Sequence, residues 1–133
     1  LQRDGLADAV EINESFSSAP GAEFFAPLSV LSTPAPAGEA FGLQIVEAMI
    51  RGIPAVQPRI AAYPEILEQG GGVLYDPSAP GALAEALGEL LADPERIRTL
   101  GAEAREIALA RFSANAAARE TIAAYEAARE LRP

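Results

Sequence analysis

Residues 29–57 read SVLSTPAPAGEAFGLQIVEAMIRGIPAVQ. The apolar runs Ser29–Thr33 and Ile53–Gln57 are typical of strands that are buried on both faces. Leu43–Arg51 is expected to be a helix, and Pro34–Gly42 is expected to be a loop because its prolines and glycines interrupt regular structure. Two strands joined through a helix predict a right-handed crossover, and therefore a parallel sheet.

The same alternation continues on both sides of this stretch. It predicts an α/β fold, a Rossmann-like parallel sheet of about four strands with helices on both faces and a long helical C-terminal tail. Residues 1–133 are expected to be a single partial domain, with αβ units over residues 1–93 and helices over residues 94–133. Within the helix Leu43–Arg51, the residues Leu43, Val46 and Ile50 have the spacing of a core-facing stripe. The other expected elements are strands at Ala9–Ile12 and within Gly70–Pro77, and helices at Pro20–Leu28, Tyr63–Gln69, Ala79–Asp93, Pro94–Phe112 and Ser113–Leu131.

The composition excludes several kinds of chemistry within this chain. The 133 residues include no Cys, no His and no Lys, so all ten basic residues are Arg. This excludes a disulfide framework, a Cys or His zinc site, a His general base, a Cys nucleophile and a Schiff-base lysine. No apolar run approaches the roughly 18 residues that a membrane-spanning helix needs, so no transmembrane segment is expected.

The charge is acidic and unevenly distributed. The net charge is −9, and residues 1–95 hold 14 acids and 3 Arg while residues 96–133 hold 5 acids and 7 Arg. Nucleic-acid binding needs basic stripes that neutralise phosphates, so we expect no nucleic-acid partner.

The loop Pro34–Gly42 is expected at the carboxyl edge of the sheet, where doubly wound folds bind their ligands. It leads into the N-terminus of the next helix, whose free N–H groups and dipole favour an anion such as a diphosphate. Gly42 would let that anion approach the backbone closely. Glu39 lies just before these amides, while Glu47 lies within the helix, where its carboxylate could accept hydrogen bonds from both hydroxyls of a ribose.

A plain structural interpretation of both acids stays open on spacing alone. Glu39 could be an ordinary loop acid. Glu47 could face solvent, or it could pair with Arg51 four residues later on the same helix.

The segment EAFGLQIVEAMIRGIPAV, residues 39–56, resembles the E-x7-E signature of the retaining GT-B glycosyltransferases of glycosyltransferase family 4, also called group 1. Members of that family follow the pattern E-x-FG-x-x-x-x-EAMA-x-G-x-PVV. The resemblance continues through YPEI, GGGVLYDPSAPGALAEALGELLADPE and ARFSANAAA, and it covers roughly residues 29–125. Acids, FG, EAM, GxP and PEI occur in the right order, which makes the resemblance specific.

The resemblance implies two Rossmann-like domains that face each other across a cleft, the C-terminal one binding a nucleotide-sugar donor. The residue that matches Glu47 holds the ribose hydroxyls, and Glu39 takes the catalytic position beside the donor sugar. The sugar is transferred with retention of configuration, usually with no metal or other cofactor, and this chain has no D-x-D pair. The implied substrate-binding residues are Glu39, Ala40, Phe41, Gly42, Leu43 and Glu47.

This sequence departs from the family pattern in two ways. Ala61 and Ala62 stand where the family usually carries a Gly-Gly pair before PEI. The acceptor domain and the first strands of the donor domain, with the family's diphosphate-binding Arg and Lys, are not in this chain. We therefore expect the chain to be the last part of a longer bacterial enzyme, cytoplasmic or peripheral to the membrane, and inactive without its N-terminal domain.

Two other functions fit the same pattern. One is a nucleotide-sugar epimerase of the same architecture, and the other is a non-catalytic helical interaction module. Because a sheet that lacks its first strands would expose edges and apolar surface, we also expect the chain to form a homo-oligomer.

Overall fold

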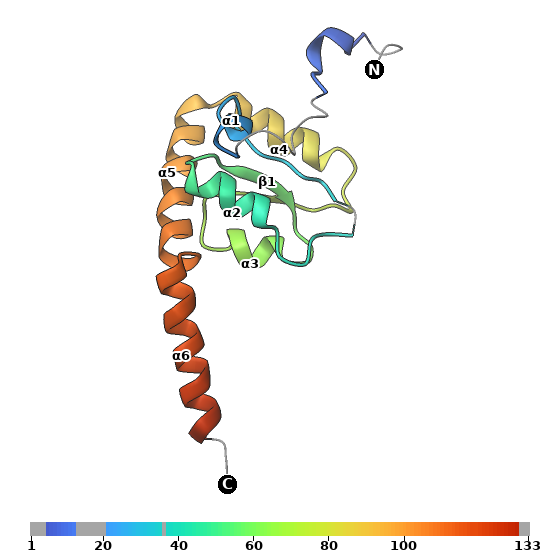
Figure 1. The fold of residues 1–133 in the computed structure, drawn as a ribbon. Coiled ribbons are helices and arrows are strands. Elements are labelled where there is room, and N and C mark those ends of the chain that lie inside the picture. The colour runs from blue at the N-terminus through green and yellow to red at the C-terminus, as the bar shows by residue number, and fades with distance from the viewer. Residues whose placement is uncertain (1–4, 13–20, 36, 131–133) are drawn as a thin grey trace.

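A computed structural model describes residues 5–12, 21–35 and 37–130. Helices and strands alternate in the middle of the chain and only helices follow, as the rainbow ribbon in Figure 1 shows. The elements are η1 (Ala7–Ala9), α1 (Gly21–Phe25), α2 (Leu43–Ile50), β1 (Ala55–Pro58), α3 (Tyr63–Leu67), β2 (Gly72–Tyr75), α4 (Ala82–Leu91), α5 (Pro94–Arg111) and α6 (Ala114–Glu130).

The sheet is parallel, which confirms the expected fold class. Strands β1 and β2 pair in parallel with Val56 opposite Val73, and Leu31 forms an isolated parallel bridge to Ala55. The expected number of about four strands is wrong, because the described residues contain a sheet of two strands and this one bridge.

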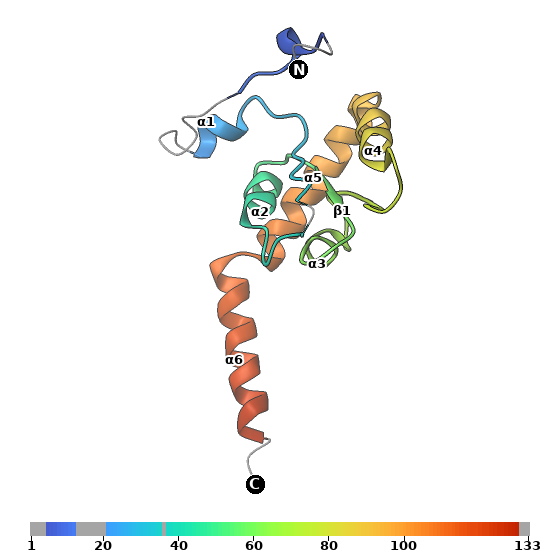
Figure 2. The same cartoon turned by 90° about the vertical axis from the view of Figure 1, so that its right-hand side faces the viewer.

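The expected strand at Ala9–Ile12 is wrong. Ala7–Ala9 form one 3-10 turn, and Val10 and Ile12 are exposed. A strand needs a neighbour for its backbone N–H and C=O groups, and in Figures 1 and 2 this segment extends away from the sheet. Local apolar composition without such a partner does not make a strand.

Helices cover both faces of the sheet. All four residues of β1 are buried, and successive residues of a strand point to opposite faces. Ala55 belongs to an apolar cluster with residues of α2, α3 and α5, while α4 also contacts both strands. This is the helix–sheet–helix layering that the buried strands predicted.

The core-facing stripe of α2 is only partly right. Val46 is buried, as expected, but Leu43 is 58% exposed and Ile50 is 37% exposed. The buried residues are Ile45, Val46, Ala48 and Met49. This helix is apolar on more than one side, and the packing of α5 against it selects the buried side.

The C-terminal helices follow the expected boundaries closely. Helix α4 begins at Ala82 instead of Ala79, because Gly81 adopts the left-handed conformation (φ 82°) just before it. The break between α5 and α6 falls at Phe112 and Ser113, where the Ser113 hydroxyl accepts a hydrogen bond from the Ala116 N–H at 3.2 Å. Helix α6 then extends away from the rest of the molecule in both views (Figures 1 and 2).

Within the described parts of the chain, no helix is both long and apolar enough to span a membrane.

Candidate functional site

The loop that carries Glu39 lies where the sequence predicted it, between the bridge at Leu31 and the start of α2. The bridge and both strands are parallel, so the loops after them lie at one edge of the sheet. The N-terminus of α2 therefore opens at the carboxyl edge, which is the ligand-binding edge of doubly wound folds.

The first turn of α2 has free amides. Gly42 precedes the helix with a φ of 80°, and no side chain in the described part of the chain caps this end. The N–H groups of Ile45 and Val46 donate to the Gly42 carbonyl at 3.0 and 3.4 Å. Within the described residues the N–H groups of Leu43 and Gln44 have no acceptor, so they are available to an anion.

Glycine is required at position 42 for a reason the sequence did not reveal. A Cβ atom there would lie 3.1 Å from Cδ1 of Ile66 and 3.4 Å from Cδ1 of Ile45. The left-handed φ disfavours any other residue as well. Gly42 thus places the start of α2 directly against α3.

Glu39 is exposed in the loop before these amides. Its carbonyl accepts a hydrogen bond from the Ala62 N–H at 3.3 Å, which ties the loop to the start of α3. Its carboxylate has no hydrogen bond or ion pair with any described residue, and neighbouring Ala40 is also exposed. Phe41 is exposed too, and its ring makes an edge contact with Phe112 at a centroid distance of 6.4 Å.

Glu47 does not form the ion pair with Arg51 that was the alternative interpretation. The Arg51 guanidinium donates to the backbone carbonyl of Glu47 at 2.8 Å and lies over the Phe25 ring at 4.8 Å from its centroid. The half-buried Glu47 carboxylate has no partner among the described residues. Glu47 is four residues after Leu43, so the two residues lie on the same face of α2.

A pocket of about 340 Å³ lies beside this helix start, and it is lined by Arg111, a cationic side chain that sequence reasoning missed. Both terminal nitrogens of Arg111 donate to the Glu65 carbonyl at 3.2 Å, and the guanidinium lies 5.0 Å from the centroid of the Phe112 ring. Phe41 and Leu43 line the same pocket. Position 111 is distant in sequence from the E-x7-E stretch, so spacing could not connect them.

A larger pocket of about 620 Å³ lies at the ends of the strands, between Pro34, Pro58, Tyr75 and the first turns of α4. Neither Glu39 nor Glu47 lines it. Burial, with a smaller contribution from Tyr63, raises the pKa of the Tyr75 hydroxyl above its ordinary value.

Ala61 lies in the turn before the PEI segment, where this chain has Ala61 and Ala62 in place of the family's usual glycine pair. Its φ is +49°, a left-handed conformation that glycine adopts at lower cost. Its methyl group lies against Gly38, where any added Cβ would overlap it. The turn thus keeps a backbone shape suited to glycine while carrying alanine, and Gly38 supplies the space.

The family model described as glycosyl transferases group 1 matches residues 15–107. The chain is 35% identical over 126 residues to MMP alpha-(1->4)-mannosyltransferase of Mycolicibacterium hassiacum, which covers 93% of this chain and 30% of that protein. It is also 35% identical over 127 residues to D-inositol 3-phosphate glycosyltransferase of Streptomyces griseus, which covers 95% of this chain and 26% of that protein. The chain therefore spans about 30% or less of the length of these curated relatives.

Solved structures of glycosyltransferases show the same similarity. Sucrose-phosphate synthase from Thermosynechococcus elongatus superposes with a TM-score of 0.74 at 29% identity, over 98% of this chain and 33% of that one. Anabaena HepE in complex with UDP superposes with a TM-score of 0.75 at 26% identity, over 92% of this chain and 34% of that one. The fold is that of the C-terminal domain of GT-B enzymes, and the chain belongs to the group 1 family of glycosyltransferases.

Proposed function

We propose that this chain is the donor-binding part of a retaining glycosyltransferase that transfers a sugar from a nucleotide-sugar donor to an acceptor. The observation that carries the proposal is the arrangement on α2. There the Glu47 carboxylate, which has no partner among the described residues, follows uncapped amides at Leu43 and Gln44. Anabaena HepE, a structural neighbour at 28% identity, has been solved in complex with UDP-glucose, which supports a nucleotide sugar as the ligand class.

Each group has a proposed role in this function. The amides of Leu43 and Gln44 and the α2 dipole bind the diphosphate, and Glu47 accepts hydrogen bonds from the ribose hydroxyls. Glu39 lies beside the donor sugar, where its charge stabilises the positive charge that develops at the transferred sugar. No metal or other cofactor has a part in this proposal, and an N-terminal domain outside this chain supplies the acceptor site.

Two variants that each remove one negative charge test the ribose contact. A hydrogen bond to a charged group contributes roughly 1.5–3 kcal/mol, so Glu47→Gln should weaken nucleoside diphosphate binding by about ten-fold or more. Calorimetric titration of this chain with UDP measures the change. Glu85→Gln is the matched control, because Glu85 is an exposed acid on α4 and its loss changes the net charge equally. Equal affinities of Glu47→Gln and the parent would contradict the role of Glu47.

Glu39→Gln separates catalysis from binding. Because Glu39 is proposed to act on the transition state, its variant should lower turnover in the intact enzyme by more than it weakens UDP binding. Steady-state kinetics with the donor, combined with calorimetry on the same variant, measure both quantities. Turnover like that of the parent would make Glu39 an ordinary loop acid.

A further inference from the structure

The loop that carries Glu39 is held at its beginning by a buried glutamine. The Thr33 N–H and hydroxyl both donate to Oε1 of Gln57, at 3.3 and 3.1 Å. Gln57 lies on β1 and is completely buried. Because a backbone N–H can only donate, the acceptor must be the amide oxygen, which fixes the orientation of the side-chain amide.

Gln57 also explains why the chain before the loop pairs with β1 at only one position. The Leu31 N–H donates to the Pro54 carbonyl at 3.0 Å, and the Val56 N–H donates to the Leu31 carbonyl at 2.9 Å. The next donor of the ladder, the Thr33 N–H, goes to the Gln57 side chain instead of a backbone carbonyl. The pairing ends there, and the chain leaves the sheet toward Glu39.

Helix α3 holds the same loop from the other side. The Tyr63 hydroxyl donates to the Thr33 carbonyl at 3.2 Å, and Tyr63 is completely buried. One residue earlier, the Ala62 N–H donates to the Glu39 carbonyl at 3.3 Å. The start of α3 therefore contacts both the residue just before the loop, Thr33, and Glu39 itself.

The network leaves one polar atom without a partner. Nε2 of Gln57 is buried and has no hydrogen-bond partner among the described residues, which destabilises the folded chain. An apolar residue would avoid this cost, but it would leave the Thr33 N–H without an acceptor. A glutamine at this position therefore serves the loop at some cost to the core.

We propose that Tyr63 and Gln57 are positioning residues that fix Glu39 relative to the free amides of α2. This inference rests on the proposed role of Glu39 in transfer. Both side chains are completely buried, so they would act on the donor only through the loop. Both act through Thr33, the residue at which the loop leaves the sheet, and α3 adds a direct backbone contact to Glu39.

Amide hydrogen exchange of this chain tests the placement without any ligand. Tyr63→Phe removes one hydroxyl and keeps the ring in the core. A hydrogen bond of this kind contributes roughly 0.5–1.5 kcal/mol, so exchange at the Thr33 and Gly38 amides should be about two- to ten-fold faster. Tyr125→Phe is the matched control, because Tyr125 is exposed on α6. Unchanged exchange at both amides in Tyr63→Phe would overturn the proposal.

A second variant tests the other anchor. Gln57→Met keeps a similar shape and removes the acceptor, so it should speed exchange at Thr33 by a similar factor, while Gln69→Met, at an exposed position, should not. If Thr33 exchange in a folded Gln57→Met variant equals that of the parent, Gln57 does not hold the loop.

Kinetics of the intact enzyme separate positioning from mere stability. Tyr63→Phe should lower kcat several-fold and leave the donor KM within about two-fold, because Glu39 is displaced and the diphosphate amides are not. A loss of thermal stability with kcat unchanged would overturn the positioning role. If the parent neither binds UDP nor transfers sugar, the proposed function fails, and faster exchange in Tyr63→Phe would still support the hold on the loop.

Discussion

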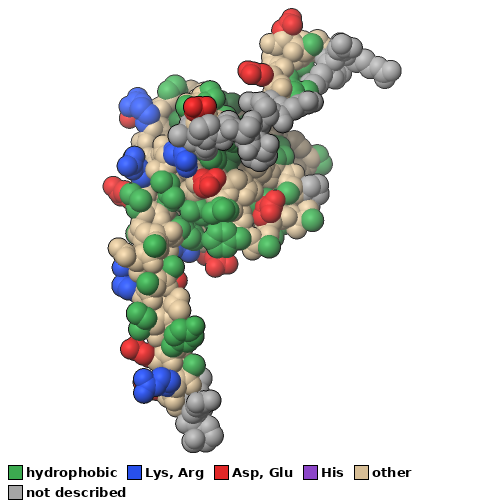
Figure 3. All heavy atoms as spheres, viewed as in Figure 1, with side chains coloured by type: hydrophobic (Ala, Val, Ile, Leu, Met, Phe, Trp, Pro, Cys, Tyr) green, Lys and Arg blue, Asp and Glu red, His purple; other side chains and the backbone are tan. Residues whose placement is uncertain are grey.

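Helices α5 and α6 have 18 and 17 residues, and both are rich in Ala, Arg and Glu. Helix α5 packs against α2, α4 and β2 and buries Gly101, Ala104 and Ala108, whereas the only buried residue of α6 is Ala116. In Figure 3 hydrophobic side chains remain visible along the free length of α6. Similar composition thus leads to opposite surroundings, because burial depends on what the rest of the chain offers as a partner.

The close packing of α5 predicts the largest effect on stability. A Cβ atom on Gly101 would overlap the carbonyl oxygen of Gly52, and backbone cannot move aside as a side chain can. Gly101→Ala should therefore lower the free energy of unfolding by about 1–3 kcal/mol, as overpacked cores do, despite the better helix propensity of alanine. Urea denaturation measures it.

Gly88 on α4 is the matched control for this prediction. A Cβ atom there meets nothing within 4 Å, so Gly88→Ala should raise the free energy of unfolding by about 0.5–1 kcal/mol. If the two variants shifted stability in the same direction, the close approach of α5 to Gly52 would be wrong.

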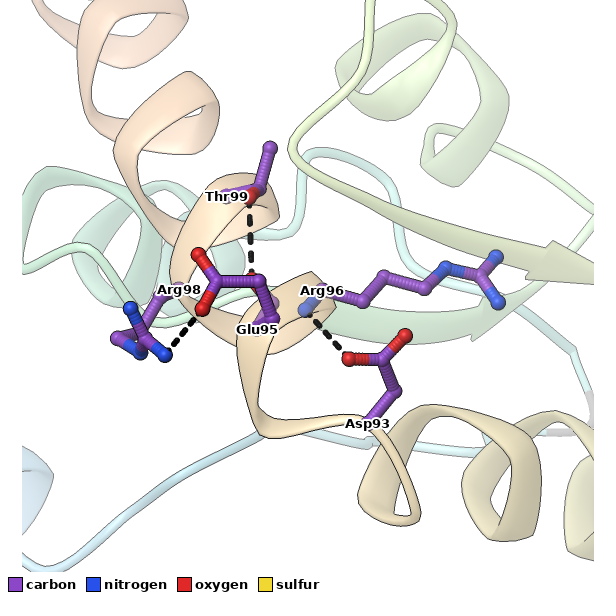
Figure 4. Close-up of polar contacts among 5 residues, drawn as sticks. All are labelled: Asp93, Glu95, Arg96, Arg98 and Thr99. Carbon is purple, nitrogen blue, oxygen red and sulfur yellow. Dashed lines mark hydrogen bonds and ion pairs between the residues drawn. The ribbon is translucent and has the colours of Figure 1, made fainter.

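The two helix caps give a smaller and sharper comparison. Asp93 accepts a hydrogen bond from the Arg96 N–H at 2.9 Å at the start of α5, where Glu95 also pairs with Arg98 (Figure 4). Asp93→Ala should cost about 1 kcal/mol of global stability, because α5 is part of the core.

Ser113→Ala removes the corresponding cap of α6. Because α6 is barely buried, this variant should reduce the helical circular-dichroism signal while the urea midpoint of the core stays within error. Equal losses of global stability in the two cap variants would mean that α6 unfolds together with the core.

Local signals in the sequence were enough to predict the helices and the start of the site. Pro94 marks a helix start because its ring fixes the φ of the first helical position, and Ser113 marks one because its hydroxyl caps an amide three residues later. The E-x7-E stretch follows from spacing along one segment. Strand pairing was harder, because it depends on distant partners. The apolar run that ends at Thr33 leaves the sheet because the Thr33 N–H donates to the side chain of Gln57, 24 residues later, instead of to a strand carbonyl.

Contacts between residues that are distant in sequence also limit the prediction of the site. The order and spacing of residues in the E-x7-E segment are enough to single out Glu39 and Glu47. The roles assigned to these two acids stay predictions. The contacts that hold their surroundings, from Tyr63 to Thr33 and from Arg111 to Glu65, join residues 30 and 46 positions apart. Two expectations for α2 are wrong for the same reason, since only the packed structure shows that Leu43 is exposed and that the Arg51 guanidinium lies over Phe25 instead of pairing with Glu47.

The exposed face of α6 predicts that the chain associates with itself. Of the predictions made for this chain, this one involves the smallest change in the stability of the core. Ile122 is 57% exposed and Tyr125 is 69% exposed, three residues apart on one side of the helix. We expect this chain to sediment as a dimer or larger species at tens of micromolar, because exposed apolar faces favour association. Ile122→Asp should restore a monomer while changing the free energy of unfolding of the core by no more than about 0.5 kcal/mol. Ala124→Asp adds the same charge about half a turn away from Ile122 and should leave association intact. A parent chain that sediments as a monomer, or equal effects of the two variants, would show that this face of α6 does not bind a second copy.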